Sequence, residues 1–253
     1  MLVFVIGLVA GFVDAIAGGG GLIMLPGLLF TGLPVGNAIA TNKLCGTAGA
    51  IMSSAKFAHS GHIDWRACGA MGIPAIIGAY IGSRSIGLLP SSWAEPVVIV
   101  LMVVITGFVL VNPTLGITPI AAPVSTRKIN LKQIVAGLFA GLIIGFHDGF
   151  FGPGTGIFLV FSLLSLWSLN FLQATGTTKV INLMTNVTAL ITFAASGDID
   201  YSKGLIGALG LGIGSYIGAS FATKKGAKLI RPLFVAVAIA LIAKLLFDYA
   251  AGS

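Results

Sequence analysis

Two short segments of similar sequence carry the residues with the clearest chemical potential. The first, residues 11–21, reads GFVDAIAGGGG, and the second, residues 145–156, reads GFHDGFFGPGTG. In each, an apolar run predicted to be helical contains one aspartate, Asp14 or Asp148, and then breaks at clustered glycines. A helix that ends inside an apolar chain leaves backbone N–H and C=O groups without partners. In a membrane protein, such a break is commonly a place where a ligand binds.

The glycine clusters predict two helix N-termini that bind an anion. A helix begins after each cluster, and its first N–H groups carry partial positive charge that attracts anions. Glycine has no Cβ to block the approach of a ligand to those amides. We therefore assign Gly19, Gly20 and Gly21 in the first segment, and Gly154 and Thr155 in the second, to a substrate site. A simpler interpretation, compatible with this one, is that the glycines only allow two helices to cross closely.

A polar stripe on the next apolar helix follows each glycine cluster. The first copy reads Ala-Thr-Asn-Lys, and the second reads Thr-Thr-Lys, with two asparagines further along at helical spacing. An intramembrane lysine costs about 2.5–3.5 kcal/mol on insertion scales, so two lysines at matching positions indicate a function. The substrate-binding residues predicted from the two stripes are Thr41, Asn42, Lys43, Thr178, Lys179, Asn182 and Asn186. The alternative is that the lysines extend along their helices to reach a membrane interface.

Asp14 and Asp148 are the matching negative charges, and two interpretations of them stay open. They could form structural ion pairs with Lys43 or Lys179, or cap the broken helices. They could instead bind a coupling proton, with His147 beside Asp148 as a second titratable group. We predict no catalytic residues, no metal site and no cofactor. No nucleotide site is visible either, because the glycine cluster lacks the Gly-Lys-Ser/Thr ending of a P-loop.

The composition places the chain in a membrane. Of its 253 residues, 57% are hydrophobic and only 8% are charged, with a mean hydropathy of +1.05. Soluble domains carry about 25% charged residues, so this chain cannot cover its surface with polar groups. Long apolar runs indicate helices rather than the alternating strands of a membrane β-barrel. The net charge of +7 lies mainly in short loops, which indicates membrane topology rather than nucleic-acid binding.

The chain consists of two similar halves. Its apolar segments are 2–17, 22–33, 37–59, 66–87 and 96–111 in the first half, and 133–150, 156–169, 172–196, 203–223 and 231–250 in the second. The aspartate and glycine motifs match at an offset of 134 residues, and the lysines match at an offset of 136. We therefore predict a first repeat at 1–112, a cytoplasmic connector at 113–131 and a second repeat at 132–253, within a single transmembrane domain.

The distribution of charge predicts that the repeats are inverted. Inversion gathers eight basic residues on one face, namely Arg66, Arg127, Lys128, Lys132, Lys224, Lys225, Lys228 and Arg231. Cytoplasmic loops carry an excess of Lys and Arg, so this face is expected to be cytoplasmic, with both termini outside. The fold class is an all-α polytopic membrane protein. Each repeat has three full transmembrane helices and a glycine-broken helix pair, which forms either short crossings or a re-entrant hairpin.

At these motifs the chain resembles the sulfite exporter TauE/SafE family, also called the toluene-sulfonate uptake permease family. The features that carry the resemblance are the Asp-x-x-x-Gly-Gly-Gly-Gly segment ending in Leu25-Pro26, the Ala-Thr-Asn-Lys helix start and the two Ser-Gly-x-Ile-Asp turns. The resemblance implies a prokaryotic plasma-membrane transporter of sulfur oxyanions or small organosulfonates. In one departure, Thr178 takes the place that corresponds to Asn42, so the two half-sites are not chemically equal.

The expected function is secondary transport of a small anion such as sulfite or sulfoacetate, most often export, by alternating access at a midplane site. The expected partners are this anion, the lipid bilayer and, as a coupling ion, the proton; a homodimer stays open, and no nucleic-acid partner is expected. The alternatives are a carrier of protons or metal cations with Asp14 and Asp148 as ligands, and a membrane scaffold without cargo. An enzyme is not expected.

Overall fold

The described part of the chain is helical throughout. The computed structural model describes residues 1–86 and 130–226, together with isolated helical residues between 232 and 247, and these residues contain no strand. The predicted segment 96–111 and nearly all of the connector at 113–131 lie outside the described residues, as does most of 231–250. The inverted-repeat arrangement and the domain boundaries therefore stay predictions.

A helix occurs at each predicted apolar segment that the structure describes. The first half contains α1 (Leu2–Ala17), α2 (Gly21–Leu29), α3 (Val35–His59), α4 (Trp65–Ala67), the π-helical turn η1 (Cys68–Gly72) and α5 (Ile73–Arg84). The second half contains α7 (Leu131–Phe150), α8 (Thr155–Leu166), α9 (Phe171–Ser196) and α10 (Tyr201–Lys225). The apolar runs thus predicted these helices, with ends that differ by a few residues.

The two Ser-Gly-x-Ile-Asp turns start helices in the same way. The carboxylate of Asp64 accepts hydrogen bonds from the first N–H groups of α4, and the carboxylate of Asp200 accepts one from the first turn of α10. The backbone N–H of Asp64 donates to the hydroxyl of Thr177 at 2.9 Å, and that of Asp200 donates to the hydroxyl of Thr41 at 3.0 Å. A threonine hydroxyl from each half therefore helps to position the start of a helix in the other half.

Glycines bring the outer helices into backbone contact. A Cβ on Gly11 of α1 would lie 2.2 Å from the carbonyl oxygen of Leu211 in α10. A Cβ on Gly145 of α7 would lie 2.2 Å from the carbonyl oxygen of Ala75 in α5. Small residues permit such close approach where lipid supplies no hydrophobic drive between helices. The pairs α1–α10 and α5–α7 are therefore held by the same kind of contact.

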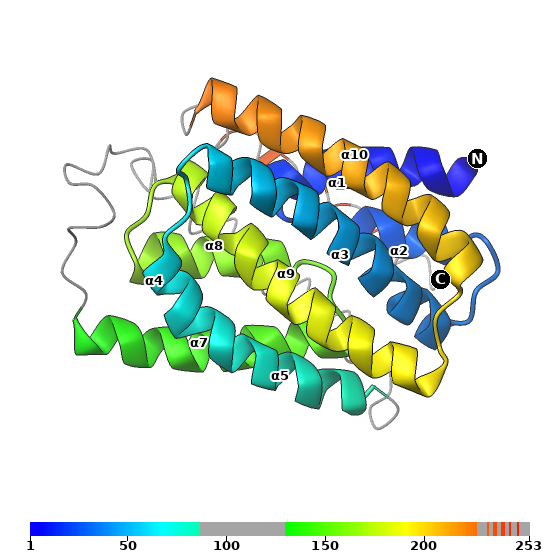
Figure 1. The fold of residues 1–253 in the computed structure, drawn as a ribbon, viewed down its shortest axis with the longest axis horizontal. Coiled ribbons are helices and arrows are strands. Elements are labelled where there is room, and N and C mark those ends of the chain that lie inside the picture. The colour runs from blue at the N-terminus through cyan, green and yellow to red at the C-terminus, as the bar shows by residue number, and fades with distance from the viewer. Residues whose placement is uncertain are drawn as a thin grey trace.

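Figure 1 shows α3 and α9 lying between the α1–α10 pair and the α5–α7 pair. At one end of the molecule, on the left of the view, lie α4, the start of α7 and the end of α10. At the other end lie the start of α1, the ends of α5 and α9 and the start of α10. The first helix of each half, α1 or α7, thus begins at the opposite end of the molecule from the other.

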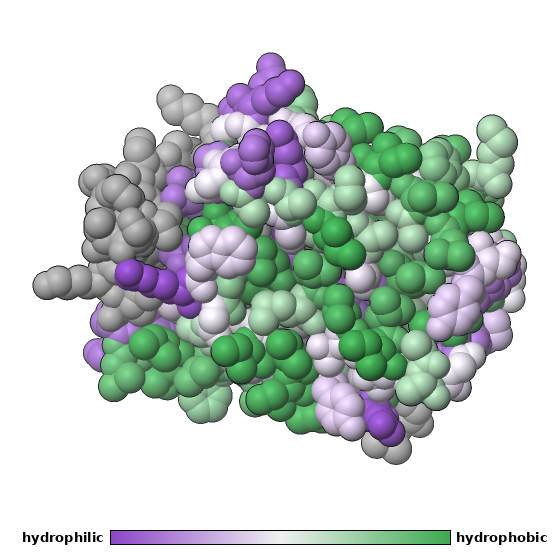
Figure 2. Space-filling view, in the orientation of Figure 1, coloured by the Kyte–Doolittle hydropathy of each residue, from purple (hydrophilic) through white to green (hydrophobic). Residues whose placement is uncertain are grey.

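The outer surface carries the apolar side chains that a bilayer requires. On α5, Ile73 and Ile77 are exposed, and on α10 Leu209 and Ile213 are exposed at the corresponding positions. Figure 2 shows apolar side chains over most of the visible face, with hydrophilic ones gathered toward its margins. Within the described ranges, α7 and α10 are long and apolar enough to cross a membrane by length and composition, whereas α1 and α8 are shorter apolar helices.

We predict that Gly145→Ala destabilises the fold, because its Cβ would meet the backbone of α5. Overpacking of this kind costs about 1–3 kcal/mol or more. The matched control is Gly36→Ala in α3, since a Cβ there meets nothing within 4 Å. Thermal unfolding of the purified protein in detergent should show a lower midpoint for the first variant only. Equal midpoints would contradict the backbone contact between α7 and α5.

Candidate functional site

The two glycine-broken segments cross at the centre of the molecule. Helix α1 ends at Gly18, which adopts a left-handed conformation with φ of 74°. A Cβ on Gly18 would lie 2.5 Å from the Cα of Gly156, near the start of α8. Neither position has room for a side chain. Close crossing, the simpler interpretation of the glycines, is therefore a property of this structure, and the anion-binding interpretation is compatible with it.

The first lysine of the polar stripes forms a buried ion pair with the second half. The Nζ of Lys43 on α3 lies 3.0 Å from Oδ1 of Asp148 on α7, and it also donates to the Asp148 backbone carbonyl. Their side chains are only 1% and 2% exposed. A lysine this deeply buried does not reach a membrane interface, so the alternative interpretation is wrong for Lys43.

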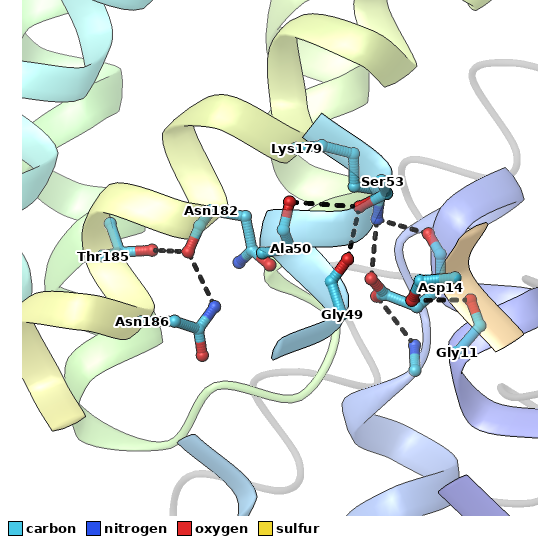
Figure 3. Close-up of polar contacts among 11 residues, drawn as sticks. Gly11, Asp14, Gly49, Ala50, Ser53, Lys179, Asn182, Thr185 and Asn186 are labelled. Carbon is cyan, nitrogen blue, oxygen red and sulfur yellow. Dashed lines mark hydrogen bonds and ion pairs between the residues drawn. The ribbon is translucent and has the colours of Figure 1, made fainter. Parts of the chain in front are cut away.

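The second lysine makes the corresponding pair with the first half. Figure 3 shows Lys179 of α9 and Asp14 of α1 directed toward each other, with Nζ 2.8 Å from Oδ2. Lys179 also donates to the Asp14 backbone carbonyl, as Lys43 does at Asp148. Oδ1 of Asp14 accepts a hydrogen bond of 3.1 Å from the backbone N–H of Gly20. That N–H was predicted to face an anion, and in this structure it is used by Asp14.

Both pairs connect the two halves, because each lysine meets the aspartate of the other half. This is the structural ion pair that the sequence left open as one role of the aspartates. Each lysine also donates a hydrogen bond to a backbone carbonyl in the last turn of a broken helix, that of Asp148 or Asp14. A positive charge there is further stabilised by the helix dipole. The ion pairs therefore hold both broken helices in place.

A small cavity of about 30 Å³ lies beside the ion pairs. Among the predicted site residues, those that line it are Asp14, Gly21, Asn42, Lys43, Asp148, Thr155, Asn182 and Asn186. The predicted residues that do not line it are Gly19, Gly20, Thr41, His147, Gly154, Thr178 and Lys179. Thr41 is instead used to fix the start of α10. The structure thus brings together residues from both halves, but not all those predicted.

Three asparagine amides face this cavity. Those of Asn42 and Asn182 have no hydrogen-bond partner among the described residues, and Asn186 donates to the backbone carbonyl of Asn182 at 2.7 Å. Gly46, also in the lining, leaves room for Asn186, because a Cβ there would lie 2.8 Å from Oδ1. Gly46 was not predicted from the sequence; its position, 136 residues before Asn182, was the available signal. Amides and ammonium groups together supply several donors to an oxyanion.

Comparison with known proteins identifies the family. The model of the sulfite exporter TauE/SafE family matches residues 3–245. The chain belongs to the TauE/SafE family. It is a membrane transporter and not an enzyme, which confirms the coarser part of the prediction.

Several bacterial relatives carry the name probable membrane transporter protein. One from Sinorhizobium sp, named ORF9, is 34% identical over 97% of this chain and 91% of its own length. Another, from Haemophilus influenzae, is 33% identical over 98% of this chain and 94% of its own. YfcA from Escherichia coli K12 is 31% identical over 98% of this chain and 89% of its own length. No solved structure matches the chain significantly.

We predict that Lys43→Gln destabilises the protein, because Asp148 would be left as a buried charge without its partner. Breaking a buried pair in this way costs about 3–5 kcal/mol. The double variant Lys43→Gln/Asp148→Asn removes both charges and should recover much of the loss. Unfolding midpoints in detergent would measure this. A double variant less stable than the single one would contradict a stabilising role for the pair.

Proposed function

We propose that the chain is a secondary transporter of a small sulfur-containing anion, either sulfite or an organosulfonate such as sulfoacetate, and that it exports this cargo. The observation that carries the proposal is the pair of buried ammonium groups, on Lys43 and Lys179, beside asparagine amides that are not engaged by the protein. Such an anion carries several acceptor oxygens, and charge-assisted hydrogen bonds from lysine suit them. The name of the family supports sulfite as cargo.

The burial of the charges beside the cavity supports alternating access. The side chains of Lys43 and Asp148 line the cavity and are only 1% and 2% exposed. An anion from solution reaches them only if the surrounding helices move. Motion of one half against the other around a central site is the usual mechanism of carriers built from repeats. The crossing of Gly18 and Gly156 lies at the border where the halves meet.

The proposed topology is that of inverted repeats in a prokaryotic plasma membrane. Helices α1 and α7 begin at opposite ends of the molecule, as inversion requires (Figure 1). The end that holds α4, the start of α7 and the end of α10 carries Arg66, Lys132, Lys224 and Lys225. We assign this end to the cytoplasm. A negative cell interior then favours anion exit by about 2.3 kcal/mol per charge per 100 mV.

Two other functions receive less support. A metal-cation carrier would need Asp14 and Asp148 as ligands, but a lysine already neutralises each carboxylate. The described ranges contain no group of three or more His, Cys, Asp or Glu side chains arranged to hold a metal ion. A scaffold without cargo would not require four charges beside a polar cavity, three of them buried. Both alternatives are excluded if the anion-binding test below succeeds.

We predict that the double variant Lys43→Gln/Asp148→Asn loses anion binding, because it removes an ammonium group while leaving no unpaired charge. Its dissociation constant should rise at least tenfold, about 1.4 kcal/mol, in titrations of the purified protein with sulfite and methanesulfonate. Lys203→Gln is the control, since Lys203 pairs with Asp200 at 3.5 Å and is one-third exposed. It should bind like the parent protein.

A panel of sulfur oxyanions, carboxylates and divalent metal ions in the same assay would define the cargo class. Saturable binding of metal ions with no response to any anion would overturn the proposal. Binding of no solute at all, together with no flux in liposomes, would favour the scaffold.

We predict that Arg66→Cys reacts with a membrane-impermeant thiol reagent from the cytoplasmic side, and that Arg84→Cys reacts from outside. Both side chains are exposed, at α4 and at the last residue of α5. The native Cys45 and Cys68 are buried, and they would be replaced by alanine to remove background reaction. Labelling in intact cells and in inverted vesicles separates the two sides. The reverse pattern would reverse the proposed orientation.

A further inference from the structure

The two ion pairs differ in how fully their carboxylates are satisfied. Both oxygens of Asp14 have donors, Gly20 at Oδ1 and Lys179 at Oδ2. Asp148 receives Lys43 at Oδ1, whereas its Oδ2 is buried and has no partner among the described residues. A buried acceptor without a donor is costly. One of the two otherwise corresponding carboxylates therefore has a buried position that a proton can fill.

The residues beside the second pair also differ from those beside the first. His147 and Thr155 stand where the first half has Val13 and Gly21, at the offset of 134. The hydroxyl of Thr155 donates its single proton to the Gly152 carbonyl at 2.7 Å. It must then accept from Nδ1 of His147, which lies 3.1 Å away. Nε2 of neutral His147 is therefore an acceptor, and it too is buried without a partner among the described residues.

The charges around the cavity sum to zero. Lys43 and Lys179 contribute two positive charges, and Asp14 and Asp148 contribute two negative ones, all of them buried or nearly so. An anion that entered alone would leave one uncompensated negative charge inside the protein. Burying such a charge is expensive, and groups in this position take up a proton instead. An arriving proton would restore neutrality and release Lys43 to bind the anion.

We propose that Asp148 takes up one proton with each anion that binds, while Asp14 stays ionised. This assignment rests on the proposed anion-transport function. Binding converts the carboxylate of Asp148 to a carboxylic acid, and the ammonium of Lys43 moves from that carboxylate to an oxygen of the anion. The groups that face Asp148 are Lys43 from α3 and, across the cavity, Asp14 from α1; His147 precedes Asp148 on α7. The cavity reaches Asp148 but not His147, so the anion acts on the aspartate.

The sign of the pH dependence follows from this balance. Because a proton binds together with the anion, affinity rises as pH falls and declines as pH rises. Coupling to one proton gives a change of at most about tenfold in the dissociation constant per pH unit. By reciprocity, anion binding at fixed pH draws one proton from solution. Methanesulfonate is the suitable probe, because its sulfonate stays ionised near neutral pH and any proton taken up belongs to the protein.

The test is infrared difference spectroscopy of the purified protein with and without methanesulfonate, combined with proton uptake measured by a pH-indicator dye. We expect the carbonyl stretch of a carboxylic acid to appear on binding, with close to one proton taken up per anion. Asp148→Glu should shift that band, whereas the matched variant Asp14→Glu should leave it unchanged. Both substitutions keep the charge, so neither leaves a lysine unpaired.

The outcomes separate this proposal from the proposed function. A band that shifts in Asp14→Glu and not in Asp148→Glu would overturn the assignment. Anion binding with no carboxylic acid band, or with proton uptake that disappears only in His147→Gln, would overturn it as well. No response to methanesulfonate or to sulfite would contradict the anion site itself, and the proton assignment would fail with it.

Discussion

The two ion pairs that connect the halves are the interaction on which the rest of the structure depends. Each lysine lies on a long helix of one half, and each aspartate lies near the end of a broken helix of the other. Four charged groups in the interior tolerate each other only if all four stay paired, since a single unpaired one is strongly destabilising. The lysines also donate hydrogen bonds to backbone carbonyls at the helix breaks. The break in each helix and the association of the halves are therefore maintained by the same contacts.

Backbone proximity is the second constraint, and it determines where glycine is needed. Because α1 contacts α10 and α7 contacts α5 with almost no side chain between them, the aspartates at their ends reach the centre of the molecule. At the centre, Gly18 and Gly156 let the broken segments cross. A bulkier residue at these positions would move the aspartates away from their lysines. The packing of the outer helices thus sets the geometry of the charges inside.

The sequence predicted the helices well because apolar runs and their breaks are local signals. It also identified Lys43, Lys179, Asp14 and Asp148, because charges in apolar segments are rare and these recur in both halves. It could not decide which charge pairs with which, since Lys179 and Asp14 are 165 residues apart and only the packing of the halves brings them together. For the same reason Thr41 was predicted to bind substrate, although in the structure its hydroxyl accepts a hydrogen bond from the turn before α10. The local sequence pattern identifies the polar residues of such a site, but tertiary contacts determine which role each residue has.

Proton uptake at Asp148 alone, and not at Asp14, affects which direction of transport is favourable. A monovalent sulfonate that moves with one proton carries no net charge, so the membrane potential does not act on it. A proton gradient directed into the cell then opposes export by about 1.4 kcal/mol per pH unit. Sulfite in its doubly ionised form keeps one negative charge after the proton is added, and the potential favours its exit by about 2.3 kcal/mol per 100 mV. With proton uptake at Asp148, a monovalent sulfonate leaves the site neutral but is exported only against the proton gradient. Divalent sulfite would be driven out by the membrane potential, but it would leave one uncompensated negative charge beside the ion pairs.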